Sequence, residues 1–486
     1  MAGTASGIEP SIAHGNEVFG IEVRGFDHIP ESERNMSLRQ VDHLWAGTSV
    51  NLLSFALGAM AIASGLDLWL ALAACAVGTL TYAFVALGSI VTARVGLPVT
   101  TLARAALGVR GSAANAFLAW MASVAFEVIN TIFGVDALLA LLKALGWSAG
   151  AGSGKLLAVL LQLALCGGIA VLGHATMVWF QRIFAAVVGA VLLIVMVVAL
   201  GRVEWAHAAM AHAQLASASV AATFLTACAL IASNPVSFLF NGPDWVRYLP
   251  SRTPARRIFG HVFWASYLPS LALTAMGACC ATLGDMSNPV AGLQPYLPAW
   301  LFILYILAVV GGSLANNVPT YYSSRLSLQA VGLKVHRHVA TSIDVVASTV
   351  IALYILFVRD FSTALNDFIA LLIVWVGPFG GVWIGDALLR RGRYDVCAIH
   401  TPTRGSLYWG WKGVNPSGVV ALLAGMGIAT LTMKSPLYEG PLATVLGGAD
   451  LSWILGFPVS MLVYGALERA RERLWVTPPN VPVRTE

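Results

Sequence analysis

The sequence has few charged residues, because Asp, Glu, Lys and Arg together make up only 10% of its 486 positions. A soluble domain averages about 25%. Hydrophobic residues reach 58%, and the mean hydropathy is +0.78. These values exclude an ordinary soluble protein and indicate a chain that crosses the lipid bilayer several times.

Cysteine and long runs of one charge are also scarce. Five of the six cysteines lie in apolar segments, without the spacing of metal ligands or secreted disulfides. We therefore expect no metal site and no bound cofactor. The net charge of +5 is not gathered into a basic tract, so no nucleic-acid partner is expected. Residues 1–40 lack the apolar core of a signal peptide and are expected to form a cytoplasmic tail.

Twelve segments are apolar and long enough to cross a bilayer, which takes about 20 residues. They are 41–65, 68–93, 113–142, 155–173, 178–200, 218–248, 256–284, 296–324, 338–358, 363–389, 416–433 and 451–470. With the N-terminus inside, all but five of the 28 Lys and Arg fall in cytoplasmic segments. The five exceptions are Lys143, Lys155, Arg202, Arg359 and Lys434. This bias satisfies the positive-inside rule and predicts a plasma- or inner-membrane protein with both termini in the cytoplasm.

The sixth predicted span contains two sites that interrupt a helix. Asn234-Pro235 and Asn241-Gly242-Pro243 each remove a backbone hydrogen-bond donor. Within hydrocarbon such a broken segment survives only where it is buried in protein or lines a cavity. We therefore expect this span to be discontinuous and to form part of a binding site.

The first span carries a weaker interruption, since Asn51, Ser54 and Gly58 lie within it but no proline does. Breaks in the first and sixth spans predict a 5+5 inverted repeat, which is typical of transporters that bind substrate at the breaks. The predicted units are a first repeat at 41–200, a second at 218–389, two additional helices at 416–470 and a cytoplasmic C-terminal tail at 471–486.

Five motifs occur in order along the chain. They are EVRGFDHIPESER at 22–34, FEVINTIFG at 126–134, DWVRYLP at 244–250, ANNVPTYYSSRLSLQAVGL at 315–333 and GGADLSWILGFPVS at 447–460. Together they resemble the nucleobase–cation symporter family of purine, cytosine and allantoin permeases, most closely its bacterial and fungal purine–cytosine branch. The resemblance implies an all-α membrane protein with a leucine-transporter-like fold, discontinuous helices 1 and 6, and alternating access.

A nucleobase is flat and edged with donors and acceptors, so its site needs aromatic faces and in-plane amides. Phe126 and Asn130 are four residues apart and share one helix face. The resemblance implies that Phe126 and Phe238 stand where the family usually has tryptophan, and that Asn130 is a substrate-binding asparagine. Phenylalanine keeps the stacking surface but removes the indole donor, which favours a different or smaller ring.

Three further polar residues are candidates for the same site. Asn316 and Asn317 precede Pro319 and point about 100° apart on a helix, so at most one faces the site. The resemblance implies a substrate-binding asparagine here without deciding between them. Ser54 matches a polar position of the family. The alternative is that the Ser54 hydroxyl only donates a hydrogen bond to a carbonyl of its own helix.

The coupling ion is the harder question. Glu127 is an ionisable residue within a span, which marks it as a functional candidate. Its open roles are proton coupling, a static hydrogen bond to Asn130 or Thr131, and outward solvation. Sodium would require hydroxyl ligands before the paired asparagines, where Gly311-Gly312-Ser313 offers only Ser313. We therefore favour a proton over sodium, with Glu127 and Ser313 as ion-coupling candidates.

Other charges in or near the spans are expected to be structural or gating groups near the cytoplasmic face. They are Asp244 with Arg247, Asp344 and Asp386.

The sequence thus predicts a symporter that imports a purine or pyrimidine nucleobase, or a related heterocycle, with a cation. One alternative is a transporter of the same fold for allantoin, a hydantoin or a vitamin-like heterocycle. Another is a receptor that binds such a ligand without moving it. A membrane enzyme would need a cluster of catalytic side chains on one membrane face, and the sequence shows none.

Overall fold

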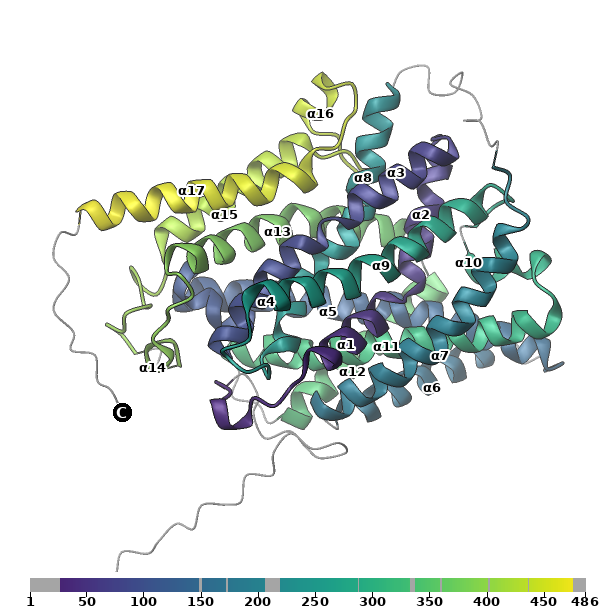
Figure 1. Ribbon diagram of the computed structural model, residues 1–486, viewed down its shortest axis with the longest axis horizontal. Helices are drawn as coiled ribbons and strands as arrows, with labels where there is room; N and C mark the ends of the chain where they lie inside the picture. Colours follow the sequence, from purple (N-terminus) through teal and green to yellow (C-terminus); the bar gives the residue numbers. More distant parts are fainter. Residues whose placement is uncertain are drawn as a thin grey trace, which may run out of the picture.

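The computed structural model describes residues 27–147, 151–171, 174–205, 219–286, 288–332, 337–358, 361–400, 403–435 and 437–474. Within these ranges the regular structure is helical, apart from the isolated bridges Trp411–Val414 and Lys434–Glu439. The long helices lie side by side, mostly along the longest axis of the molecule (Figure 1). This arrangement confirms the predicted all-α class.

The elements are η1 (Glu31–Glu33), α1 (Leu38–Ser49), α2 (Leu52–Ala63), α3 (Leu68–Thr79), α4 (Tyr82–Val95), α5 (Val99–Ala144), α6 (Ala151–Val171), α7 (His174–Leu200), α8 (Val220–Ser237), η2 (Phe238–Phe240), η3 (Gly242–Val246), α9 (Ala255–Ala281), α10 (Pro289–Leu293), η4 (Gln294–Tyr296), α11 (Ala299–Ala330), α12 (Arg337–Val358), α13 (Phe361–Leu389), α14 (Val396–His400), α15 (Pro416–Thr432), α16 (Pro441–Val445) and α17 (Ser452–Leu474).

Seven helices among the described residues are long and apolar enough to cross a membrane, and the bent pair α1–α2 makes an eighth. Shorter apolar helices occupy Gly152–Cys166, Ser342–Val358 and Pro416–Thr432. Each of the twelve predicted segments overlaps one of these elements or α17. The count of twelve crossings and the inverted relation between two five-helix units stay predictions.

The first span is broken at Asn51, between α1 and α2, where the two helices meet at 51°. The side chain of Asn51 forms hydrogen bonds with backbone groups at the end of α1 and at the start of α2. Its Nδ2 donates to the carbonyl of Thr48 at 3.1 Å, and its Oδ1 accepts from the backbone N–H of Ser54 at 2.9 Å. An asparagine can do this because its amide carries a donor and an acceptor. The predicted discontinuity of helix 1 is therefore present.

The sixth span is also discontinuous, although the break lies later than Asn234-Pro235. α8 continues through Pro235 to Ser237, and then gives way to the short 3-10 turns η2 and η3 on either side of Asn241. Asn241 has φ −142° and ψ −34°, which ends the helical path. A proline inside a helix loses only one backbone bond, which buried neighbours can compensate.

The helices α2 and α9 approach each other at two glycines. A Cβ on Gly58 would lie 2.6 Å from the carbonyl carbon of Thr274, and one on Gly277 would lie 2.8 Å from that of Phe55. Small residues of this kind allow close helix packing in a membrane, where dispersion replaces the hydrophobic effect. The contact fixes α2, and with it one half of the broken first span.

Gly58→Ala should destabilise the protein by about 1–3 kcal/mol, as overpacking does. We expect a value near the upper end of this range, because the atoms that the added Cβ would meet belong to the backbone of Thr274 and cannot easily move. Gly260→Ala is the matched control on α9, where an added Cβ meets nothing within 4 Å. Thermal unfolding of the purified variants in detergent checks this. Equal midpoints for the two variants would contradict the close contact.

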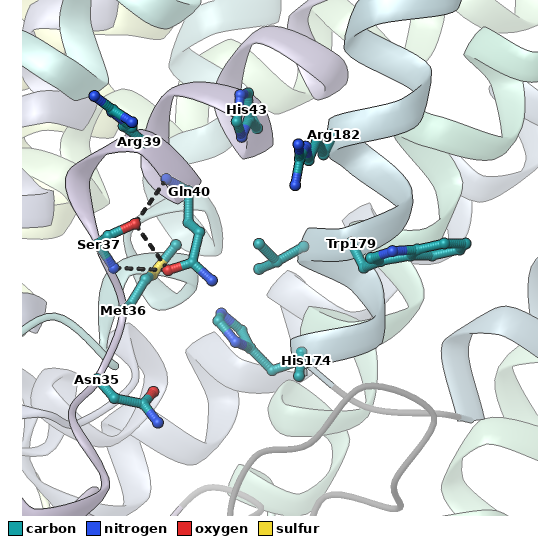
Figure 2. A pocket seen from close by; sticks show the side chains of 11 residues that line it. Asn35, Met36, Ser37, Arg39, Gln40, His43, His174, Trp179 and Arg182 are labelled. Atoms are coloured by element: carbon teal, nitrogen blue, oxygen red, sulfur yellow. Dashed lines mark hydrogen bonds between the residues drawn. The ribbon is translucent and has the colours of Figure 1, made fainter.

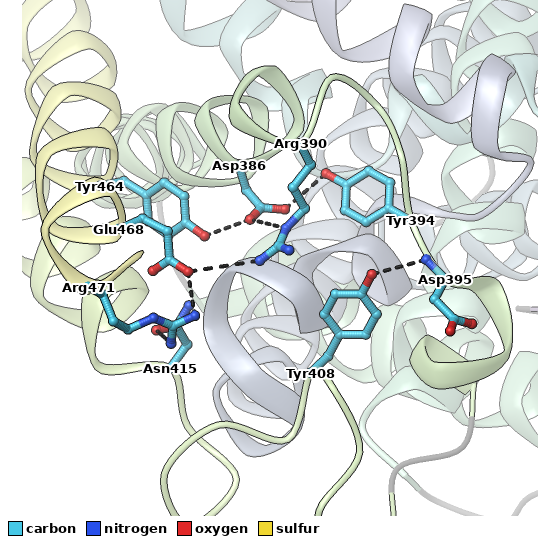
Figure 3. A network of polar contacts seen from close by, with 9 residues as sticks. All are labelled: Asp386, Arg390, Tyr394, Asp395, Tyr408, Asn415, Tyr464, Glu468 and Arg471. Carbon is cyan, nitrogen blue, oxygen red and sulfur yellow. Dashed lines mark hydrogen bonds and ion pairs between the residues drawn. The ribbon is translucent and has the colours of Figure 1, made fainter. Parts of the chain in front are cut away.

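The C-terminal helix α17 is tied to α13 by a polar network around Asp386 (Figure 3). The Asp386 carboxylate accepts from Arg390 at 2.8 Å, from Tyr394 at 2.9 Å and from Tyr464 of α17 at 2.6 Å. Glu468 extends the network with an ion pair to Arg471, and Asp386 itself is only 1% exposed. The predicted structural role of Asp386 therefore has a definite geometry.

Tyr464→Phe should lower stability by about 1.5–3 kcal/mol, because it removes a hydrogen bond to a charged group. Tyr438→Phe serves as the control, since Tyr438 is 41% exposed. Chemical unfolding monitored by tryptophan fluorescence measures the difference. A Tyr464→Phe protein as stable as the control would refute the proposed link between α13 and α17.

Candidate functional site

A small enclosed cavity lies where the two breaks meet, and we call it the central cavity. It is lined by Asn51, Leu53, Phe126, Asn130, Asn234, Ser237, Phe238, Phe240, Asn241, Asn316 and Thr320. These residues come from α2 and the break before it, from α5, from α8 with its broken end, and from α11. None of them carries a charge, so the cavity suits a neutral polar ligand.

Three phenylalanines form the apolar part of this wall. Phe126 on α5 packs edge-on against Phe368 at 5.1 Å between ring centroids. Phe238 begins the broken end of the sixth span and stacks near Tyr82 at 6.1 Å. The structure therefore brings Phe126 and Phe238 to one cavity, as the sequence predicted, and adds Phe240.

The predicted asparagines form a chain of hydrogen bonds at the cavity. Asn130 Nδ2 donates to Asn316 Oδ1 at 2.8 Å and to the carbonyl of Phe126 at 2.9 Å. Asn316 Nδ2 donates to the carbonyl of Thr48 at 2.9 Å, at the end of α1. The chain links α5 and α11 to the broken first span, so a ligand that contacts either amide would act on all three elements.

Two other candidates lie behind the cavity wall. Asn317 points toward α5 instead, where its Nδ2 lies 3.2 Å from the carbonyl of Glu127 and 3.2 Å from Thr131 Oγ1. Ser54 is fully buried and accepts from Asn234 Nδ2 at 3.0 Å. Of the two adjacent asparagines, Asn316 lines the cavity. Ser54 instead positions a lining residue.

Sequence reasoning treated Asn51, Asn234 and Asn241 as helix breakers and missed that their side chains line the cavity. The available signal was an amide side chain at each break, because a break exposes both backbone and side chain to the same space. Asn241 is 4% exposed, and its Oδ1 has no hydrogen-bond partner in the described structure. A buried acceptor of this kind favours a ligand that donates an N–H or O–H.

The central cavity has a volume of about 10 Å³, which is roughly the room needed for one water molecule. Binding a heterocycle therefore requires its walls to separate. A second cavity of about 570 Å³ lies between the beginning of α1 and the beginning of α7. Its lining includes Gln40, His43, His174 and Arg182, which Figure 2 shows on the facing helices α1 and α7. We call this the α1–α7 cavity.

An aromatic cluster separates the two cavities along α1. It consists of Trp45, Tyr82, Phe238 and Trp245, with Trp45 at 4.7 Å from Trp245 and 5.7 Å from Phe238 between ring centroids. Gln40 and His43 of α1 line the α1–α7 cavity, whereas Asn51 beyond Trp45 lines the central cavity. The cluster therefore closes the central cavity on this side.

The broken half of the sixth span is held by several elements. The backbone N–H of Val99, at the start of α5, donates to Asp244 Oδ1 at 2.6 Å. Arg247 donates to the Tyr322 hydroxyl of α11 at 2.7 Å, and Trp245 Nε1 donates to Ser323 at 3.0 Å. Asp244 and Arg247 thus hold the broken half of the sixth span against α5 and α11, and the choice between a structural and a gating role for them stays open.

The ion-coupling candidates Glu127 and Ser313 do not line the central cavity. Glu127 is fully buried and accepts a hydrogen bond from Ser348 of α12, not from Asn130 or Thr131. Ser313 accepts from Gln162 of α6 at 2.5 Å and donates to the carbonyl of Val310 at 2.7 Å. The ion-coupling roles of both residues stay predictions. Within the described residues, no group of three or more His, Cys, Asp or Glu could hold a metal ion.

Comparison with known proteins shows which family this chain matches. A family model described as permease for cytosine/purines, uracil, thiamine and allantoin matches residues 28–456. A putative purine-cytosine permease of Bacillus subtilis is 25% identical over 467 residues, covering 93% of this chain and 96% of the relative. The allantoin permease of Bacillus subtilis is 23% identical over 482 residues, covering 91% and 92%.

Solved structures show the same fold. Mhp1, a nucleobase-cation-symport-1 family transporter, in a closed conformation with bromovinylhydantoin bound, has a TM-score of 0.76 at 16% identity and covers 95% of this chain and 98% of its own. Inward-facing Mhp1 has a TM-score of 0.72 at 18% identity, with 93% and 96% covered. These matches confirm the leucine-transporter-like fold class predicted from the sequence. The chain belongs to the family of permeases for cytosine, purines, uracil, thiamine and allantoin, and is a multi-pass membrane transporter of the nucleobase–cation symporter type rather than an enzyme.

Proposed function

We propose that this transporter imports a neutral nucleobase or closely related heterocycle together with a proton, and that the substrate binds in the central cavity. The observation that carries the proposal is the lining of this cavity. Phenylalanines and five asparagines surround a space without charge, at the junction of two broken helices. Aromatic faces with a few placed polar groups are what a flat, neutral ring requires.

In this proposal the ring stacks between Phe126 and Phe238. Asn130 and Asn316 read one edge of the ring, and Asn241 Oδ1 accepts a hydrogen bond from another. Phenylalanine supplies stacking without an indole N–H, so recognition of the ring edge falls to the amides. A ring rich in N–H donors is favoured, because Asn241 offers a buried acceptor that has no other partner among the described residues.

We place the α1–α7 cavity on the cytoplasmic side, as the distribution of basic residues predicts for both termini. The aromatic cluster then acts as the inner gate. Opening it would join the α1–α7 cavity to the central cavity and release substrate inward. Rocking of the units 41–200 and 218–389 against each other would supply the motion, as in other transporters built from repeats.

The contact region between α1 and α11 supports coupling to a proton rather than to sodium. Gln181 of α7 enters this region, where its Nε2 donates to the carbonyl of Ala315 and its side chain packs on Gly47. The hydroxyl of Ser313 is directed to α6, and Gly312 packs against the carbonyl of Val50 without adding a ligand. A sodium ion needs several oxygen ligands. A related fold belongs to a Na+-coupled sialic acid symporter with a TM-score of 0.57 at 12% identity, so the fold does not decide the ion.

Allantoin or a hydantoin is the second candidate substrate. It is favoured by the two phenylalanines at positions where the family usually has tryptophan, and by the bromovinylhydantoin bound in the Mhp1 structure. Both rings are neutral, flat and rich in N–H donors, so they suit the same cavity.

Counterflow in proteoliposomes tests the proposal. Purified protein is loaded with unlabelled cytosine, adenine, hypoxanthine, uracil, allantoin or a hydantoin and exposed outside to the labelled compound. At least one should exchange at a rate well above that of empty liposomes, and Phe238→Ala should abolish the exchange. Saturable binding without exchange would identify a receptor instead. Absence of both for every compound would overturn the assignment of the cavity.

A further inference from the structure

A second buried polar cluster lies beside the central cavity, between α5, α11 and α12. Its two acids are Glu127 on α5 and Asp344 on α12, and both are 0% exposed. Nothing in the sequence connects them, because 217 positions separate them and the expected role of Asp344 is that of a structural or gating charge. The fold brings them to one interface, where Asp344 acts electrostatically on Glu127.

Two hydrogen bonds between α5 and α12 define the geometry of this pair. Glu127 Oε2 accepts from Ser348, and Asp344 Oδ1 accepts from the indole N–H of Trp120. Asp344 and Ser348 are four residues apart, so they occupy one face of α12 with about 5–6 Å between their Cβ atoms. The two carboxyl groups therefore lie within about one helical turn of each other.

Each carboxyl group keeps one oxygen without a hydrogen-bond partner in the described structure, namely Glu127 Oε1 and Asp344 Oδ2. From α11, Ser324 lies beside both carboxyls and Tyr321 lies beside Glu127. The hydroxyls of Ser324 and Tyr321 are also buried. Polar groups from α5, α11 and α12 thus converge on one buried point.

The described part of the chain places no cation in direct contact with this pair. Among the described residues, neither carboxylate has a Lys, Arg or His nitrogen within 4.0 Å. Arg325 on α11 acts on Asp344 from farther away and stacks over Tyr322. From α6, the group that faces the pair is the Cys166 thiol. Burying two unpaired carboxylates costs far more than the folded state can supply, so at least one must be protonated.

We propose that Glu127 and Asp344 form a proton-sharing carboxyl pair that binds the coupling proton of this transporter. The inference rests on the proposed function, since it assigns the ion site for the same transport cycle. One proton enters from the outer side and bonds to one of the unpartnered oxygens. The same proton leaves from that oxygen to the inner side, so no other reactant is required.

The pair is joined to the substrate site through adjacent residues. Glu127 follows Phe126, which lines the central cavity, and its carbonyl accepts from Asn317. Asn317 in turn follows Asn316, which holds the amide of Asn130. A change of charge at the pair alters how α12 packs on α5 and α11, and thereby biases the positions of Phe126 and Asn316. By linkage, substrate binding must change proton affinity by the same factor.

The test compares Glu127→Gln and Asp344→Asn with wild type and with Glu204→Gln, the same substitution at an exposed glutamate. In proteoliposomes a one-unit pH gradient should support about ten-fold accumulation of substrate for one proton per cycle. We expect Glu127→Gln to accumulate none while its counterflow stays within about three-fold of wild type, because glutamine keeps the shape but carries no titratable proton. Asp344→Asn should shift the pH dependence of accumulation, and Glu204→Gln should match wild type.

A second measurement does not depend on turnover. Infrared difference spectra of purified protein, recorded on adding substrate, should contain a protonated-carboxyl C=O band that is lost in Glu127→Gln and retained in Glu204→Gln. Accumulation by Glu127→Gln that still follows the pH gradient would overturn the proton site. Accumulation by wild type that follows a sodium gradient alone would do the same. A wild type without counterflow of any heterocycle would instead overturn the proposed function, so the two failures are distinct.

Discussion

Asn316→Ala is expected to lower the affinity for the transported heterocycle by about 10- to 100-fold, which corresponds to about 1.4–2.8 kcal/mol. Asn317→Ala should change the affinity by less than about three-fold, which is under 1 kcal/mol. The two residues are neighbours with identical side chains, so each serves as the matched control for the other.

The physical reason is the direction of each amide. Asn316 lines the central cavity and joins Asn130 to the carbonyl of Thr48 at the end of α1. Its removal takes away a group that faces the ligand and also removes one buried hydrogen bond to each of these two partners. Asn317 instead contacts the backbone of Glu127 and the hydroxyl of Thr131, outside the cavity.

Equilibrium binding of the labelled substrate to purified, monodisperse variants checks this difference. Asn317→Ala has a second expected effect, because it releases the carbonyl of Glu127. Its proton-driven accumulation should fall more than its binding does. Equal losses of affinity in the two variants would mean that the described register of α11 is wrong at the site.

Trp45→Ala is expected to open the path between the α1–α7 cavity and the central cavity. Trp45 is fully buried at the centre of the aromatic cluster, and Gly242 leaves just enough room for it, since a Cβ there would lie 2.6 Å from the Trp45 ring. Truncating a buried tryptophan costs about 3–5 kcal/mol. Much of this cost falls on the closed conformation, so the open one becomes more populated.

Cysteine labelling measures the opening. Ser237→Cys places a thiol in the wall of the central cavity, and Cys397→Ser removes the one native cysteine that is exposed among the described residues. In this background Trp45→Ala should raise the rate of labelling by a water-soluble maleimide about ten-fold, for a population shift of about 1.4 kcal/mol. Trp69→Ala, at a tryptophan that is 66% exposed, is the control. Unchanged labelling in Trp45→Ala would exclude the cluster as a gate.

Much of the fold could be predicted because the bilayer imposes strong constraints on sequence. Apolar segments of fixed length and an asymmetry of basic residues are visible without any structure. Helix breaks are visible too, since Asn51 and the Asn241-Gly242-Pro243 run stand out in apolar surroundings. The exact end of α8 was not predictable, because whether Pro235 stops the helix depends on neighbours that satisfy the freed carbonyl.

The site was predictable where local spacing determines direction and not where tertiary packing does. Phe126 and Asn130 share a helix face at a separation of four, and the structure places both in the central cavity. The choice between Asn316 and Asn317 depends on the rotation of α11, which no local pattern gives. The sequence suggests hydrogen-bond partners for Glu127 on its own helix, whereas the structure places Ser348 of α12 against its carboxyl group. Contacts between distant segments of this kind have no local signature.

The most direct measurement is the position of the substrate in an experimental structure of the protein, determined with the heterocycle that shows counterflow. The account predicts one flat ring between Phe126 and Phe238, within hydrogen-bond distance of Asn130 or Asn316, and a central cavity wider than the present volume of about 10 Å³. A ring bound in the α1–α7 cavity instead, with the breaks at Asn51 and Asn241 still closed on each other, would contradict it.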